Sequence, residues 1–124
     1  TYTLDVWRTF SGKGFSLDQD WHRKIAAQAY DRSFYPEGVA RQMAAVVTQN
    51  NRKPELGSVS VPTLVIHGAD DPLVPVEGGK DTAEAIPGAE LIIIDGMGHD
   101  LPHDGAWPQI IDAIVAHTQK NTSF

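Results

Sequence analysis

Two short polar segments in the second half of the chain carry side chains that can work as an acid–base pair. Residues 67–75 read HGADDPLVP and contain Asp71, and residues 95–100 read DGMGHD and contain His99. A carboxylate that fixes the tautomer of an imidazole and stabilises its protonated form supports a nucleophilic hydroxyl in acyl transfer. Asp71 is therefore a candidate orienting acid, and His99 is a candidate general base.

Each polar segment follows a run of apolar residues that is typical of a strand buried on both faces. Residues 61–67 read VPTLVIH and residues 91–94 read LIII, and helices are expected at 78–86 and 106–119. Strand, helix, strand, helix is a βαβα unit with a parallel sheet. Adjacent parallel strands lie about 4.8 Å apart. The polar segments at their carboxyl ends should therefore emerge side by side, where open α/β sheets bind their ligands.

Residues 1–56 carry helical signals instead. Ser16 and Gln19 stand at capping-box spacing before a first helix. Pro36 suits the first position of a second helix because its fixed φ is already helical. The glycine-rich segment 11–14 lacks the spacing that cradles phosphate, so a flexible turn is expected there. Two apolar faces recur at helical intervals: Trp21, Ile25, Ala26 and Ala29 on the first helix, and Val39, Met43, Val46 and Val47 on the second.

The charge is distributed unevenly and indicates two regions. Residues 1–56 hold 8 Lys/Arg against 6 Asp/Glu, or +2, whereas residues 57–124 hold 2 against 10, or −8. Eight of the ten aromatic residues also precede Gly57. We expect a helical cap segment at 1–56 and a βαβα core part at 57–124. The polar stretch 50–54, which contains a proline, should join them.

Composition excludes several classes of protein. The 124 residues are 41% hydrophobic, with no cysteine and a net charge of −6. These values suit a small soluble domain and argue against disulfide scaffolds, thiol chemistry and nucleic-acid binding. No run of about 18 apolar residues could cross a membrane, and no signal peptide is visible. We expect a cytoplasmic protein, and a chain that begins at Thr1 rather than Met is expected to be a piece of a longer one.

Two apolar parallel strands cannot satisfy their own edges and faces. No further six-residue β-branched run exists in residues 1–56 that could extend the sheet. We therefore expect the rest of the sheet to lie outside this chain and the open edge to favour self-association. The alternative is a two-stranded ribbon covered by the helices of the first region.

The two polar segments together resemble the last two catalytic loops of the α/β-hydrolase fold, in which chain order runs nucleophile, acid, histidine. The resemblance implies that Asp71 is the triad acid and His99 the triad base. Residues 31–45, DRSFYPEGVARQMAA, resemble the cap region of esterases similar to aclacinomycin methylesterase. The resemblance covers residues 7–118 and implies an incomplete α/β-hydrolase fold, with a helical cap segment before the last two parallel strands and their helices.

The chain departs from that family at the nucleophile, because no Gly-x-Ser-x-Gly occurs in it. The resemblance thus implies the C-terminal part of a serine-type carboxylic-ester hydrolase, inactive alone. Its partners would be a missing N-terminal part and a small-molecule, ester-like substrate. A non-catalytic member of the fold, which binds a ligand or partner, is the competing hypothesis. An independent interaction domain is a third.

Asp70 is the alternative acid. We favour Asp71 because the family resemblance implies it and because Asp71, which precedes Pro72, is biased toward an extended backbone that projects its side chain, whereas Asp70 should form an Asx turn.

The remaining histidines suggest no cofactor. His99 and His103 have the four-residue spacing of helical metal ligands, but Pro102 lies between them and no glutamate accompanies them. We expect neither a metal nor another cofactor. His67, at the end of a strand, is expected to be a hydrogen-bonded structural residue.

Overall fold

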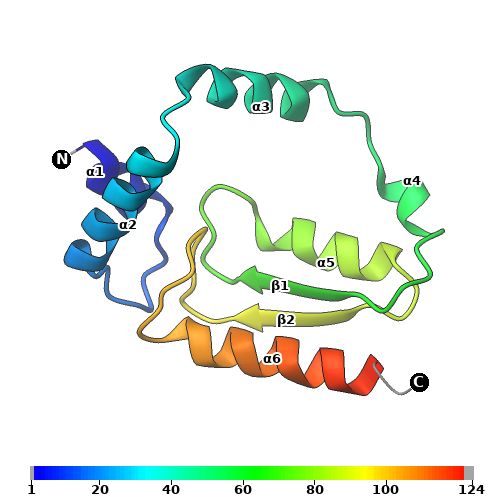
Figure 1. The fold of residues 1–124 in the computed structure, drawn as a ribbon. Coiled ribbons are helices and arrows are strands. Elements are labelled where there is room, and N and C mark those ends of the chain that lie inside the picture. The colour runs from blue at the N-terminus through cyan, green and yellow to red at the C-terminus, as the bar shows by residue number, and fades with distance from the viewer. Residues whose placement is uncertain (1, 122–124) are drawn as a thin grey trace.

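The computed structural model describes residues 2–121, with side chains from Leu4 onward. Helices precede a βαβα unit in this part of the chain (Figure 1). The elements in order are α1 (Tyr2–Phe10), α2 (Gln19–Arg32), α3 (Pro36–Thr48), α4 (Lys53–Leu56), β1 (Leu64–Gly68), α5 (Val76–Ala85), β2 (Glu90–Ile94) and α6 (Ala106–Asn121).

The two strands pair in parallel, as the sequence predicted. Leu64 is opposite Glu90 and Gly68 is opposite Ile94, so both strands end at the same edge. Helix α5 packs against both strands and α6 packs against β1 (Figure 1). Strand β1 begins at Leu64, later than the predicted residue 61, because Pro62 has no N–H to donate to a ladder.

The strands are less buried than expected. In β2, Leu91 and Ile93 are each 36% exposed, whereas Ile94 is 2% exposed. The side chains therefore alternate between a well-covered and a partly covered face. Helix α5 contacts both strands but leaves Leu91 and Ile93 partly open.

The helices of residues 1–56 match their predictions in part. Helix α2 is capped by Asp18, whose carboxylate accepts hydrogen bonds from the N–H groups of Asp20 and Trp21, so the expected capping box at Ser16 is wrong. An acceptor two residues closer to the helix reaches its first free N–H groups directly. Helix α3 begins at Pro36 as predicted. Helix α1 was not predicted, and α4 lies in the stretch expected to be a linker.

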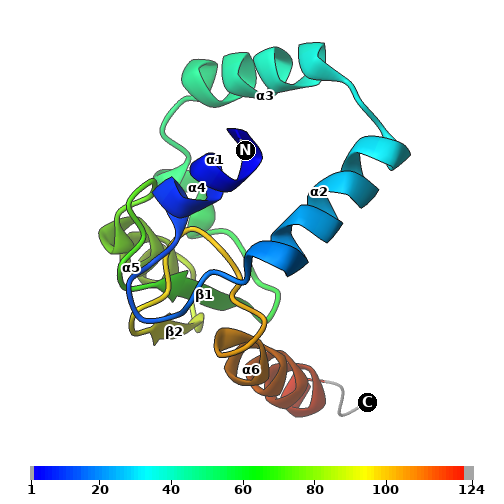
Figure 2. The same cartoon turned by 90° about the vertical axis from the view of Figure 1, so that its left-hand side faces the viewer.

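Helix α3 stands apart from the βαβα unit in both views (Figures 1 and 2). Its apolar face is open, with Val39, Met43, Val46 and Val47 each more than half exposed. Helix α1 packs against α2, and α4 packs against α5. Among the described residues, no helix has the length and apolar character needed to cross a bilayer.

The small hydrophobic core lies at the carboxyl edge of the sheet and includes a contribution from the first region. Ile94, Met97 and Ala106 are its buried members. Phe15, from the loop after α1, packs against this cluster together with partly buried residues of the strands and α6. The core therefore ties the α1–α2 loop to the end of the sheet. The partly buried residues are Ile66, Ile92 and Ile110.

Candidate functional site

The two candidate residues meet in the structure. Nδ1 of His99 lies 2.8 Å from Oδ2 of Asp71, within hydrogen-bond distance. Asp71 follows β1 and His99 follows β2, so the parallel pairing brings their loops together as the sequence predicted. The Asp71 side chain is only 5% exposed, whereas that of His99 is 44% exposed. A buried carboxylate thus supports a ring that remains open to a reactant.

Asp71 also shapes its own loop. Its Oδ1 accepts hydrogen bonds from the N–H groups of Leu73 and Val74, each at 2.8 Å. These two bonds form an Asx turn at Asp71. The sequence predicted such a turn at Asp70 instead, and that prediction is wrong. The physical reason is that a carboxylate has two oxygens, so Asp71 closes the turn with one and holds His99 with the other.

The environment of Asp71 favours its charged form. Burial by itself would raise the pKa of this carboxyl group. The N–H of Val74, the ring of His99 and the N–H of Leu73 donate hydrogen bonds that outweigh burial, and the pKa lies below its ordinary value of 3.8. Asp71 is therefore an ionised acceptor at neutral pH, and His99 donates from Nδ1.

The backbone of His99 is held by the first region of the chain. Its N–H donates to the carbonyl oxygen of Phe10 at 2.8 Å, and the N–H of Gly14 donates to the carbonyl of Gly96 at 2.9 Å. This contact between distant segments was not predicted from the sequence. The pattern that could have indicated a close approach of two backbones is the pair of Gly-x-Gly segments at 12–14 and 96–98.

A pocket of about 380 Å³ opens beside the pair, and His99 and Asp71 both line it. Its apolar surface comes from Ile66, Val74, Met97 and Leu101. A pocket of this size with few polar groups is typical of small-molecule sites.

His67 is a structural neighbour of the pair. Its Nε2 lies 2.9 Å from the carbonyl oxygen of Val74 and 3.6 Å from Oδ2 of Asp71. The side chain is 13% exposed. This matches the expected hydrogen-bonded role at the end of the strand.

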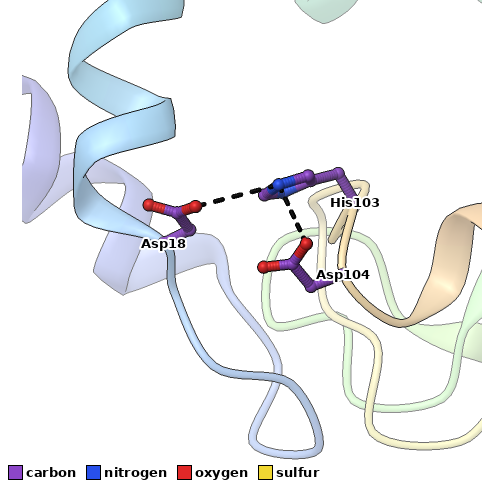
Figure 3. A group of neighbouring side chains, drawn as sticks. All are labelled: Asp18, His103 and Asp104. Atoms are coloured by element: carbon purple, nitrogen blue, oxygen red, sulfur yellow. Dashed lines mark ion pairs between the residues drawn. The ribbon is translucent and has the colours of Figure 1, made fainter.

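His103 lies in a separate cluster with Asp18 and Asp104 (Figure 3). Its Nε2 lies 3.0 Å from Oδ1 of Asp104 and 3.7 Å from Oδ2 of Asp18, and its ring stacks on Trp21 at a centroid distance of 4.7 Å. The three ligand atoms lie within 4.8 Å of one another, which is a spacing that could hold a metal ion. Contacts from a single ring nitrogen to two carboxylates account for the same arrangement, so the cluster by itself identifies no metal centre.

Comparison with known sequences gives a family. The profile described as alpha/beta hydrolase fold matches residues 5–106. Rhodomycin D methylesterase DnrP of Streptomyces peucetius is 32% identical over 120 residues, covering 96% of this chain and 40% of that protein. The 2-hydroxy-6-oxo-6-(2'-aminophenyl)hexa-2,4-dienoic acid hydrolase of Metapseudomonas resinovorans is 42% identical over 112 residues, covering 83% and 34%.

Comparison with solved structures gives the same fold. A bromoperoxidase from Bacillus anthracis superposes with a TM-score of 0.75 at 23% identity, covering 95% of this chain and 43% of that one. A serine hydrolase involved in carbazole degradation gives a TM-score of 0.70 at 20% identity, covering 94% and 46%. The chain spans about 40% of the length of the methylesterases it matches. By sequence profile and by fold, this chain belongs to the alpha/beta hydrolase fold family.

Proposed function

We propose that this chain is the C-terminal part of a serine-type hydrolase of carboxylic esters, with Asp71 as the orienting acid and His99 as the general base. Residues 1–56 would form part of its cap and residues 57–124 the end of its core. The nucleophilic serine and the oxyanion hole would come from a preceding N-terminal part. The observation that carries the proposal is the 2.8 Å hydrogen bond between His99 and Asp71 at the carboxyl ends of adjacent parallel strands.

The hydrogen bond defines the chemistry available to His99. Because Nδ1 donates to ionised Asp71, Nε2 is the nitrogen left to accept a proton. In the complete enzyme it would take the proton of the serine hydroxyl as the oxygen attacks the ester carbonyl, and then give that proton to the departing alcohol. Water would next lose a proton to His99 as its oxygen attacks the acyl carbonyl, and His99 would return that proton to the serine oxygen as the bond between serine and the acyl group breaks and the acid leaves. Asp71 stays ionised and stabilises the imidazolium throughout.

The pocket suggests how an ester would be held. Its apolar residues can cover the acyl or alcohol part of a small molecule, while the open ring of His99 faces the bond to be cut. The methylesterase relatives support an ester with a small alcohol group as the substrate class. No cofactor enters this scheme.

The exposed apolar surfaces support an additional core part. Leu91 and Ile93 of β2 are open, and so are Ile111 and Ile114 of α6, at 51% and 47%. Large apolar side chains exposed together on neighbouring elements are often covered by a partner surface in soluble proteins. An adjoining sheet and its helices would cover them.

The test is a grafted enzyme, in which this chain replaces the matching segment of rhodomycin D methylesterase from S. peucetius. We expect the graft to hydrolyse a p-nitrophenyl ester. His99→Ala should abolish the reaction, and Asp71→Asn should lower kcat by about 10⁴-fold because it stabilises the wrong tautomer, as in the serine-protease example from which this magnitude is taken. Asp70→Asn is the matched control, since Asp70 lies next in the chain but makes no hydrogen bond to His99.

A folded graft with full activity after His99→Ala would contradict the proposal. A folded graft that binds the ester without hydrolysing it would favour the competing hypothesis of a non-catalytic binding protein. Cooperative thermal unfolding of each variant establishes that it is folded.

A further inference from the structure

The α1–α2 loop crosses the loop that carries His99. We define the glycine strap as residues 10–14 and the histidine loop as residues 96–99. We propose that the glycine strap positions the His99 ring against Asp71, with Gly12 as the positioning residue. This inference deepens the proposed function and rests on it for its catalytic meaning, but the contact itself can be tested without activity.

Hydrogen bonds fasten the strap to the histidine loop at two points. The carbonyl oxygen of Phe10 accepts the N–H of His99 at 2.8 Å, and the N–H of Gly14 donates to the carbonyl of Gly96 at 2.9 Å. Both bonds use backbone atoms only. The position of the His99 backbone is therefore fixed by a segment far away in sequence, in addition to the end of β2.

Between these two hydrogen bonds, the backbones of the strap and the histidine loop lie too close together for a side chain to fit. A Cβ at Gly12 would meet the Gly96 oxygen, and would lie 2.5 Å from the Gly98 nitrogen. A Cβ at Gly98 would in turn meet the Gly12 nitrogen and the Phe10 oxygen. The obstructing atoms are backbone, which cannot swing aside as a side chain can. Glycine is required at these positions because the two backbones touch.

Residues at both ends of the glycine strap pack against other parts of the chain. Phe10 is the last residue of α1, and its ring lies edge-on to that of His99 with 6.2 Å between centroids. Phe15 follows the strap and packs on the core formed by Ile94, Met97 and Ala106. The histidine loop contributes Met97 to the same core, so both backbones are held, and a Cβ at Gly12 should force them apart and shift the backbone that carries the His99 ring. The Nδ1 of His99 would then leave its 2.8 Å contact with Asp71.

The first test measures the ring without catalysis. In the isotope-labelled grafted enzyme at about pH 9, where imidazoles are uncharged, ring ¹⁵N shifts report which nitrogen of His99 carries the proton, whether or not the graft is active. We expect the Nδ1–H form in the unmodified graft and a mixture of tautomers in Gly12→Ala. Gly78→Ala is the matched control, because its Cβ would meet only Val74 Cγ1 at an ordinary 3.7 Å.

The second test measures catalysis in the grafted enzyme. Gly12→Ala should lower kcat by about 100-fold with little change in KM, since the base is displaced by a fraction of an ångström to an ångström while the pocket is kept. Gly14→Ala, whose Cβ would lie 2.5 Å from Gly96 Cα, is a second variant should Gly12→Ala fail to fold. Gly78→Ala should leave both constants unchanged.

The possible outcomes distinguish a failure of the strap proposal from a failure of the proposed function. Unchanged tautomer and kcat in folded Gly12→Ala would overturn the positioning role while leaving the triad intact. Loss of folding in both strap variants would also overturn it, since the strap would then be a general structural element. An inactive unmodified graft would count against the proposed function alone, and the tautomer measurement would still decide the role of the strap.

Discussion

Asp71 combines two tasks that usually need separate residues. One carboxylate oxygen closes the Asx turn with Leu73 and Val74, and the other accepts from His99. The turn therefore fixes the direction in which Asp71 presents its second oxygen. A carboxylate whose rotamer is set in this way loses little conformational freedom when it orients the imidazole. The same hydrogen bonds keep it ionised despite its burial.

The lowered pKa of Asp71 predicts how stability depends on pH. Because the pKa in the folded state lies below the ordinary 3.8, ionised Asp71 stabilises the fold above that value, and the contribution disappears as pH falls through the folded-state pKa. In the grafted enzyme, Asp71→Asn should lower the free energy of unfolding by about 1 to 3 kcal/mol at pH 7. Urea unfolding at pH 7 and pH 2 measures the difference between the two proteins. It should shrink at low pH, and a gap that does not depend on pH would contradict the assignment.

At the scale of elements, short connections place the chemistry. A tight turn joins α5 to strand β2, and Gly88 in this turn has a positive φ of 74°. Gly96 repeats this backbone conformation directly after β2, where the chain turns toward His99. Both glycines therefore hold a left-handed conformation that other L-residues adopt only at a cost. The strand between them is aligned so that its end meets the loop after β1.

Replacing Gly88 should measure the free-energy cost of a left-handed backbone conformation without a steric contribution from neighbouring residues. A Cβ at this position would have no heavy atom within 4 Å, so sterics outside the backbone play no part. Gly88→Ala should lower the free energy of unfolding of the grafted enzyme by about 1 kcal/mol, and Gly88→Asn by less, because asparagine tolerates the left-handed region. Gly57→Ala is the control, with an ordinary φ of −62° and only distant contacts. Equal effects of alanine at the two positions in urea unfolding would argue against the turn.

The elements that the sequence predicted well are those with strong local patterns. The strands at 64–68 and 90–94 are rich in apolar and β-branched residues, so their strand character and parallel pairing followed from composition and spacing. Helix α1 escaped although Leu4, Trp7 and Phe10 recur at helical spacing, because the segment is short and carries no clear cap signal. The position of the Asx turn escaped as well, because either aspartate can form such a turn, and the structure places it at Asp71, the residue predicted to meet His99.

Contacts between distant segments were beyond the sequence pattern. The glycine strap touches the histidine loop through backbone atoms, so no hydrophobic or charge pattern records the contact. Asp18 and His103 likewise meet only because the core brings the start of α2 to the loop before α6 (Figure 3). Residue types and the spacing of the strands suggested Asp71 and His99 as an acid–base pair, and the family resemblance added the expectation of a triad.

The molecule as a whole presents apolar surface on two separate elements. Helix α3 exposes Val46 and Val47, and α6 exposes Ile111 and Ile114. Burial of apolar surface is worth about 25 cal/mol per Å², so covering these faces is favourable whether the cover is an adjoining core or another copy of the chain. The strand pair adds an unpaired backbone edge, which is a template for further pairing.

The chain studied alone should self-associate. Sedimentation velocity at micromolar concentration should find species larger than the 13.5 kDa monomer, with thermal unfolding that is broad rather than two-state. Ile111→Glu with Ile114→Glu should shift the distribution toward monomer, because two charges on the open face of α6 oppose its burial. Lys24→Glu is a control that changes charge on α2 without touching an apolar face. A monomer that melts sharply would contradict the incomplete sheet and favour an independent interaction domain, since only a chain able to bury its own apolar surface unfolds in one cooperative step.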